Sequence, residues 1–299
     1  MRPGRTAERG FTLVEAIVVI VIVGIIGAIV AVFIRGPIVG YSDSVARLET
    51  LDEADLALRR MARDIRLALP NSVRVTDGGA TLELLLTRTG GRYLAVDDGA
   101  AAGNVLDFEN PANTRFSVVG GLADAVDAGD FVVVYNLGTG MAPADAYNLN
   151  SDPGGDSRNI ARIAQAAARG DTELTLADNP FARQAEPMPS PGNRFQVVTG
   201  AVSYRCQQEN GRLVLRRYAG YDIEAQTPAA PKNGNSALLA ARVADCANLF
   251  RYDPPDNLEL RRSALVILSL ALHTRGSADL VDPGGVVRLV HQVHVDNTP

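Results

Sequence analysis

The sequence predicts an α+β fold, in which a long N-terminal helix precedes a domain built on an antiparallel β-sheet. An uninterrupted apolar run covers residues 11–34, and an amphipathic helical pattern covers residues 35–69. Short β-like runs separated by turn residues then fill residues 70–299. These runs could form one β-rich domain or a domain divided into two lobes. We expect the amphipathic part of the helix to pack on the sheet of its own chain, because it has one apolar face.

The apolar run is long enough to cross a membrane. Residues 11–34 read FTLVEAIVVIVIVGIIGAIVAVFI and contain a single charged side chain, Glu15. As a helix this run would be about 36 Å long, whereas the hydrocarbon core of a bilayer is ~30 Å thick. The arginines among residues 1–10 favour a cytoplasmic N-terminus. A secretory signal would instead have a shorter apolar region and a small-residue cleavage site, but residues 35–37 read RGP.

Glu15 is an unusual residue for this position. A carboxylate inside a membrane segment costs roughly 2.5–3.5 kcal/mol on insertion scales, so such residues are rare and commonly functional. The sequence around it, RGFTLVE at residues 9–15, resembles the processing site of type IV prepilins and type II secretion pseudopilins. In these families a glycine precedes the cut, a phenylalanine follows it, and the pattern continues as T-L-hydrophobic-E.

This resemblance implies a role for each residue of the motif. Residues 1–10 would be a leader, which the prepilin peptidase would remove between Gly10 and Phe11. Phe11 would then be N-methylated. Glu15 would stay in the membrane and pair with the Phe11 amine of a neighbouring subunit. Physical chemistry agrees with such a pair, because a buried charge that loses its partner costs roughly 3–5 kcal/mol.

The resemblance also implies a pilin-like fold and a filament subunit rather than an enzyme, with no cofactor. The expected partners are the prepilin peptidase, other pilin or pseudopilin subunits and an inner-membrane assembly platform. The expected location is the inner membrane, with a single span and the C-terminal domain in the periplasm, before incorporation into a pilus or pseudopilus.

Other segments indicate a branch of the family. Residues 52–74, residues 290–299, the triplet 204–206 and Cys246 resemble the minor pilin-like subunits of MSHA pilus biogenesis (the MshO type), which are expected at the filament tip. A J-type minor pseudopilin of type II secretion is the alternative within the family. A membrane-tethered periplasmic enzyme is the alternative from another class.

The middle and C-terminal parts give more local predictions. Pro37 predicts a kink or a break near residues 35–37, and Pro70 ends the helical pattern. Glu209-Asn210-Gly211 predicts a hairpin turn, and residues 138–159 read as a long loop. Residues 237–246 are expected to form a short helix. The expected strands cover residues 72–75, 81–87, 92–96, 105–108, 131–135, 172–176, 194–198, 201–206, 212–218, 265–272 and 286–295.

The two cysteines, Cys206 and Cys246, are too few for a four-cysteine zinc site or a disulfide scaffold. In a periplasmic domain they favour one disulfide, which would stabilise the fold by roughly 2–4 kcal/mol. The alternative is two unpaired buried thiols.

The charge and the spacing of metal-binding residue types argue against nucleic acid and metal ions as ligands. The formal net charge is −5, which argues against nucleic-acid binding. His291 and His294 lie three apart, so in a strand they would point to opposite faces, and we expect no metal there. Asp152 and Asp156 are a conceivable calcium loop, but they lack the twelve-residue pattern and a solvated turn is the better interpretation.

Overall fold

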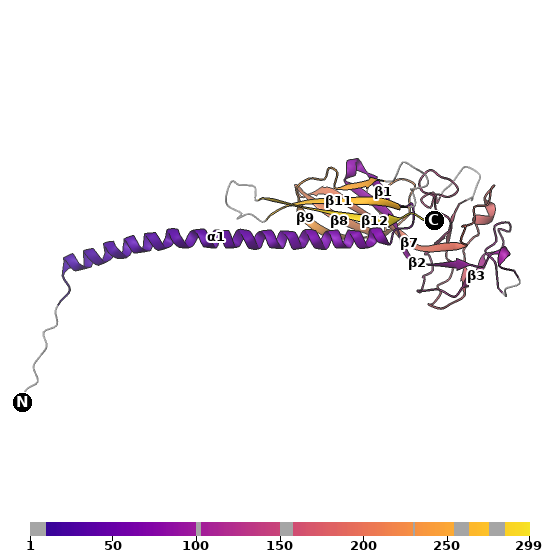
Figure 1. Cartoon of the computed structure of the whole chain (residues 1–299), viewed down its shortest axis with the longest axis horizontal. Helices are drawn as coiled ribbons and strands as arrows, with labels where there is room; N and C mark the ends of the chain where they lie inside the picture. The colour runs from indigo at the N-terminus through magenta and orange to yellow at the C-terminus, as the bar shows by residue number, and fades with distance from the viewer. Residues whose placement is uncertain (1–9, 100–102, 150–157, 230, 254–262, 275–284) are drawn as a thin grey trace, which may run out of the picture. The chain divides into compact units, whose positions relative to one another are not determined.

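The computed structural model describes residues 10–99, 103–149, 158–229, 231–253, 263–274 and 285–299. The chain divides into two compact units (Figure 1). One comprises Met1–Thr50 with Thr274–Gly285, and the other comprises Leu51–His273 with Val286–Pro299. Helix α1, Leu13–Arg66, contributes residues to both.

The first unit contains the apolar part of α1. Residues Leu13–Ile34 have a mean hydropathy of 3.5 and none of them is buried, so this helix is long and apolar enough to cross a membrane. The helix continues through Pro37 without interruption. The structure therefore excludes the break that the sequence left open near residues 35–37. A proline removes only one backbone donor, and the helical hydrogen bonds on either side of it can continue.

The second unit is built on an antiparallel β-sheet. Within the described residues, twelve strands join one sheet, whose main path runs β10-β11-β9-β8-β7-β2-β3-β6. Strand β1 pairs with β2, β12 with β11, and β4 with both β5 and β7. The strands are β1 Arg74–Thr76, β2 Thr81–Tyr93, β3 Arg115–Val119, β4 Phe131–Val133, β5 Ile160–Arg162, β6 Glu173–Thr175, β7 Arg194–Glu209, β8 Arg212–Tyr221, β9 Asn235–Val243, β10 Phe250–Asp253, β11 Ser263–His273 and β12 Val286–Asp296. Short 3₁₀ helices occur at η1 Asp77–Gly79, η2 Val96–Asp98 and η3 Phe181–Arg183.

Several sequence predictions for this unit are wrong. Residues 237–246 do not form a helix, since most of them belong to β9, which pairs with β8. The run is too short for helical propensity to outweigh the hydrogen bonds that a neighbouring strand offers. Residues 105–108 form no strand, whereas β3, β5 and β10 are strands that the sequence did not predict.

Two strands are longer than predicted. The predicted strands 81–87 and 92–96 become the single strand β2, and the predicted strands 194–198 and 201–206 become the single strand β7. Strands β2 and β7 pair with each other, with register shifts between Leu85 and Thr89.

The hairpin prediction is confirmed. Strand β7 ends at Glu209 and pairs there with Arg212, the first residue of β8. The two residues between them have positive φ angles, 49° for Asn210 and 77° for Gly211. A two-residue turn with φ above zero at both positions is the type I′ turn, which asparagine followed by glycine favours.

A hydrophobic cluster of the second unit contains residues from α1 and from the sheet. The helical members recur every three or four positions, which places them on one face of α1. They are Ala54, Ala57, Leu58, Met61, Ala62 and Ile65. Sheet residues of the same cluster include Leu82, Tyr204, Leu215, Leu268 and Val293. Two further clusters lie among β2 to β8 and their connecting loops.

A buried carboxylate connects α1 to two strands. Asp64 is 3 % exposed and accepts a hydrogen bond from the Tyr204 hydroxyl of β7 at 2.7 Å. It also pairs with the Arg217 guanidinium of β8 at 2.7 Å. Burial, followed by the charge of Asp64, raises the pKa of Tyr204, so its hydroxyl stays a donor at neutral pH. Glu53, about three helical turns before Asp64, accepts the Ala241 backbone N–H at 2.8 Å.

A second buried carboxylate lies within the sheet. Glu83 on β2 is fully buried and pairs with Arg74 on β1 at 2.7 Å. The Tyr221 hydroxyl donates to its other oxygen at 2.5 Å. The Arg74 guanidinium also lies 3.7 Å from the centre of the Tyr147 ring. Both buried carboxylates therefore have a cation and a tyrosine hydroxyl as partners, which offsets their desolvation.

We expect Asp64→Ala to lower the free energy of unfolding by roughly 3–5 kcal/mol, because it leaves the Arg217 guanidinium buried without its counter-charge. Urea unfolding of the detergent-solubilised chain, followed by tyrosine fluorescence, measures this change. Asp55→Ala is the matched control. Its salt bridge to Arg59 is exposed on both sides, so we expect a loss below about 1 kcal/mol. Equal losses for the two variants would contradict the prediction.

Candidate functional site

The start of α1 is fixed by Thr12. The Glu15 backbone N–H donates to the Thr12 hydroxyl at 3.3 Å, and the Ala16 N–H donates to the Thr12 carbonyl at 3.1 Å. Thr12 is therefore the N-cap of the helix, with Glu15 at the third helical position. The motif resemblance assigned no separate role to Thr12. The available signal was a threonine three residues before a glutamate at the start of an apolar run, which is the capping-box pattern.

Phe11 and Glu15 are both exposed in the single chain. Phe11 is 70 % exposed and lies just before the cap. Glu15 lies in the first turn of α1, where the helix dipole favours a negative charge. Within the described residues, which begin at Gly10, its carboxylate forms no ion pair. The pairing of Glu15 with the Phe11 amine of another subunit stays a prediction.

Gly10 is not required by the folded chain. A Cβ atom built on Gly10 would meet no atom within 4 Å, and its φ angle lies outside the left-handed region. A side chain at this position would therefore meet no steric obstacle in the fold. The remainder of the expected leader, residues 1–9, lies outside the described residues.

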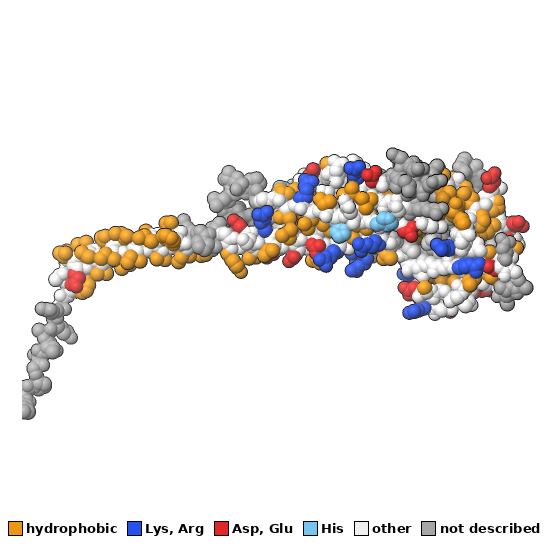
Figure 2. Space-filling view, in the orientation of Figure 1, with side chains coloured by type: hydrophobic (Ala, Val, Ile, Leu, Met, Phe, Trp, Pro, Cys, Tyr) orange, Lys and Arg blue, Asp and Glu red, His pale blue; other side chains and the backbone are white. Residues whose placement is uncertain are grey.

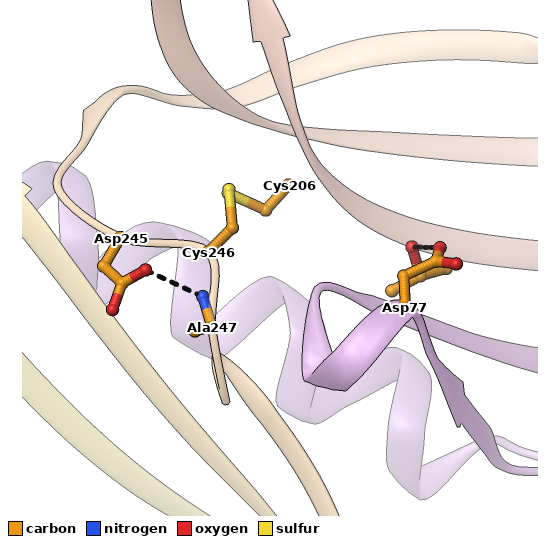
Figure 3. Close-up of a disulfide and its surroundings, with 6 residues drawn as sticks. Asp77, Cys206, Asp245, Cys246 and Ala247 are labelled. Atoms are coloured by element: carbon orange, nitrogen blue, oxygen red, sulfur yellow. Dashed lines mark hydrogen bonds between the residues drawn. A yellow bond between two sulfur atoms is a disulfide. The ribbon is translucent and has the colours of Figure 1, made fainter.

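The two cysteines form a disulfide in the second unit (Figure 3). Cys206 on β7 and Cys246, which follows β9, have their Cα atoms 5.5 Å apart. Of the two states that the sequence left open, the structure contains the bridge. Strand β8 lies between β7 and β9 in the sheet, so the bridge connects β7 to the segment that follows a strand two places away. The Ala247 N–H donates to the Asp245 carboxylate at 2.9 Å and fixes the turn that carries Cys246.

The histidine and aspartate positions give no metal centre in the described part of the chain. His291 is half-buried on β12 and His294 is exposed, as expected for strand residues that point to opposite faces. Among the described residues no group of three or more histidine, cysteine or acidic side chains is placed to hold a metal ion. Asp152 and Asp156, the conceivable calcium loop, lie outside the described residues.

A depression of about 570 Å³ lies in the second unit. One charged side chain, Arg194, and the half-buried Tyr135 contribute to its wall. The described residues that line it include no histidine, cysteine, aspartate or glutamate. They are Asn71, Tyr135, Leu137, Met141, Pro191, Gly192, Arg194, Asn297, Thr298 and Pro299.

Comparison with known families identifies the N-terminal segment. Residues 5–31 match the family model described as the prokaryotic N-terminal methylation motif. No curated protein sequence matches the chain, and no solved structure matches it. The matched segment contains Gly10, Phe11, Thr12 and Glu15. It supports a type IV pilin or pseudopilin subunit and, with the apolar helix Leu13–Ile34, it fits a single-pass, membrane-anchored protein.

We expect replacement of both Cys206 and Cys246 by serine to lower the free energy of unfolding by roughly 2–4 kcal/mol, because the unfolded chain regains the freedom of a 40-residue loop. Urea unfolding under non-reducing conditions measures the loss. Adding a reductant should destabilise the parent chain by a similar amount and leave the serine variant unchanged. A parent chain insensitive to reductant would contradict the prediction.

Proposed function

We propose that this chain is a subunit of a pilus-like filament, made as a prepilin and processed at the membrane. The observation that carries the proposal is the position of the methylation motif. The motif at residues 5–31 coincides with the start of an apolar helix that begins at Leu13 and carries its acidic residue, Glu15, in the first turn. A plain membrane anchor has no need of a carboxylate there, since it opposes insertion.

Processing would occur between Gly10 and Phe11. The lack of any steric need for glycine in the fold supports an external reason for it, namely the binding pocket of the prepilin peptidase. After the cut, Phe11 would carry the new α-amino group, which would be N-methylated. This group would lie just ahead of the Thr12 cap, about one helical turn from Glu15.

The new amino group would serve assembly. In the hydrocarbon core a lone carboxylate is strongly disfavoured, whereas a carboxylate that meets a buried cation is tolerated. Glu15 would therefore favour the position in which it contacts the Phe11 amine of a neighbouring subunit. Such a pair sets the register between two helices more sharply than apolar contacts do, because lipid tails are as apolar as the helix side chains.

Within this function we propose an MSHA-type minor subunit that acts in pilus biogenesis at the filament tip. The support is the resemblance of residues 52–74, 290–299 and 204–206 and of Cys246 to that branch. The loop expected over residues 138–159 is our candidate for contact with a surface or a secreted substrate, and its residues 150–157 lie outside the described residues. A J-type minor pseudopilin of type II secretion remains the alternative branch.

The proposed location is the inner membrane, with the N-terminus in the cytoplasm and the second unit in the periplasm. The disulfide supports an oxidising compartment for that unit. We also propose that the amphipathic part of the helix packs on the sheet, which the shared cluster and the contacts of Asp64 support. The partners would be the prepilin peptidase, an inner-membrane assembly platform and other pilin or pseudopilin subunits.

Intact mass of the membrane-extracted chain tests the processing step. Co-expression with a prepilin peptidase should remove residues 1–10 and add one methyl group to Phe11, and omission of the peptidase should leave the chain uncut. Gly10→Ala should block the cut without changing the stability of the fold, because the added methyl group meets no atom. A cut near Arg35, or none in the presence of the peptidase, would contradict the proposal.

Glu15→Ala tests assembly separately from processing. We expect this variant to be cut normally and to be lost from sheared filament fractions, because the Phe11 amine of its neighbour is left without a counter-charge. Glu15→Asp is the matched control, since it keeps the charge and should retain part of the assembly. A chain whose cellular phenotype survives Glu15→Ala unchanged would favour a membrane-tethered enzyme instead.

A further inference from the structure

The depression of about 570 Å³ in the second unit has an apolar wall and carries one cation. Leu137 and Met141 come from the connection between β4 and β5, while Pro191 precedes β7 and Pro299 follows β12. Met141 is 53 % exposed, and the flexible methionine side chain adapts to apolar ligands of irregular shape. Over the face of the second unit that Figure 2 shows, hydrophobic side chains are mixed with acidic and basic ones. The depression differs, because the described residues that line it include no acid.

Arg194, the first residue of β7, is the cation of this depression. It is exposed, and among the described residues its guanidinium forms no hydrogen bond and no ion pair. Arg92, which lies opposite it on β2, is different because it pairs with Asp98. A guanidinium presents its donors in a fork that matches the two oxygens of a carboxylate. Arg194 is therefore available to bind an anionic group of a ligand.

One carboxylate of the chain lies near enough for the charge of Arg194 to act on it. The pKa of Asp296 is lowered, mainly by hydrogen bonds from Thr298 and to a smaller extent by the charge of Arg194. Asp296 accepts the Thr298 N–H at 2.9 Å and does not line the depression. Its negative charge opposes the binding of an anion at Arg194, so removal of this charge should strengthen such binding.

Two asparagine amides in the wall are already used by the fold. The Asn71 amide donates to the backbone carbonyls of Asn136 and Asn297, at 2.9 and 3.1 Å. The Asn297 amide donates to the Tyr252 hydroxyl at 3.0 Å, and its oxygen accepts the Asn71 backbone N–H at 3.1 Å. A sugar has many hydroxyl groups that need polar partners when they are buried. An apolar ligand with one carboxylate needs only the apolar wall and Arg194.

The backbone of Tyr135, whose side chain lines the depression, is strained. Its φ angle is 53°, in the left-handed region that aromatic residues rarely adopt. The residues after it fix this conformation, since the Asn136 amide donates to the Pro70 carbonyl at 2.7 Å and the Leu137 N–H donates to the Ala144 carbonyl at 2.9 Å. Such strain persists only where the surrounding structure imposes it, and it is concentrated at ligand sites. The wall is thus ordered before any ligand arrives, which lowers the cost of binding.

We propose that this depression binds a peptide segment of a partner protein in which an apolar or aromatic side chain stands next to a carboxylate. The apolar side chain lies against Tyr135 and Met141, and the carboxylate accepts hydrogen bonds from Arg194. Met141 belongs to the loop assigned above to contact with a surface or a secreted substrate. The identity of the partner therefore rests on the proposed function, whereas the affinity for the peptide does not.

A tryptophan-containing peptide tests the site, because the chain itself has no tryptophan. The probe is the acetylated and amidated tripeptide Leu-Trp-Glu, and its matched neutral control has Gln in place of Glu. Each is titrated with the detergent-solubilised full chain, and the fluorescence anisotropy of tryptophan reports binding. We expect the Glu peptide to bind about two- to fivefold more tightly than the Gln peptide, the range for one exposed ion pair.

Substitutions in the wall separate the two parts of the contact. Arg194→Gln should abolish the difference between the two peptides, and Arg194→Lys should retain part of it. Arg169→Gln is the matched control, since it removes the same charge from an exposed residue that does not line the depression, and it should leave the difference unchanged. Met141→Ser should weaken both peptides by the same factor.

Asp296→Asn gives a variant in which binding should improve. It removes the charge that opposes an anion at Arg194 and keeps an oxygen that can accept the Thr298 N–H. We expect the preference for the Glu peptide to rise about twofold, the size of a screened interaction between charges near a surface. A gain of this kind cannot arise from a loss of fold.

The outcomes separate this site from the filament function. Equal affinity of the parent chain for the two peptides, or a preference that survives Arg194→Gln, overturns the site even where the leader is cut and the chain assembles. Displacement of the Glu peptide by glucuronate at equal concentration assigns the depression to an acidic sugar and overturns the peptide. A preference that Arg194→Gln abolishes and Asp296→Asn raises supports the site, even where the leader is never cut.

Discussion

The carboxylate of Glu15 is the constraint on which the organisation of the chain depends. It lies in the first turn of a helix whose following residues, as far as Ile34, are apolar and unburied. Neither a soluble helix nor a simple membrane anchor would benefit from this combination, because the helix needs lipid and the carboxylate opposes it. In the proposed filament the conflict would disappear, because a cation from another chain would reach the carboxylate.

The second unit uses buried charge in a related way. Asp64 and Glu83 are both desolvated, and each meets an arginine and a tyrosine hydroxyl from other strands. Such pairs stabilise little compared with apolar replacements, but they strongly disfavour any arrangement that breaks them. Asp64 therefore disfavours arrangements that separate it from Tyr204 and Arg217, and the Cys206–Cys246 bridge limits how far the segment after β9 can separate from β7.

The sequence predicted the features that depend on local chemistry. The apolar span follows from residues 11–34, and the type I′ turn follows from Asn210 and Gly211, because both patterns restrict the backbone by themselves. Strand β9 was mistaken for a helix because its alanines and leucines favour neither state strongly, and pairing with β8 decided the outcome. The partners of Asp64 lie about 140 and 153 positions away, so no local pattern could reveal them.

Within the N-terminal motif, the fold of the single chain needs some residue types and not others. Thr12 satisfies an orphan N–H of α1 through its hydroxyl, and this bond uses the backbone of Glu15 rather than its carboxylate. Gly10 meets no steric limit in the fold, and Phe11 is exposed. The single chain therefore explains the threonine and leaves the glycine, the phenylalanine and the glutamate side chain unexplained. Those three are the positions that a protease and a neighbouring subunit would contact in the proposed function, whereas the threonine is explained by the helix cap alone.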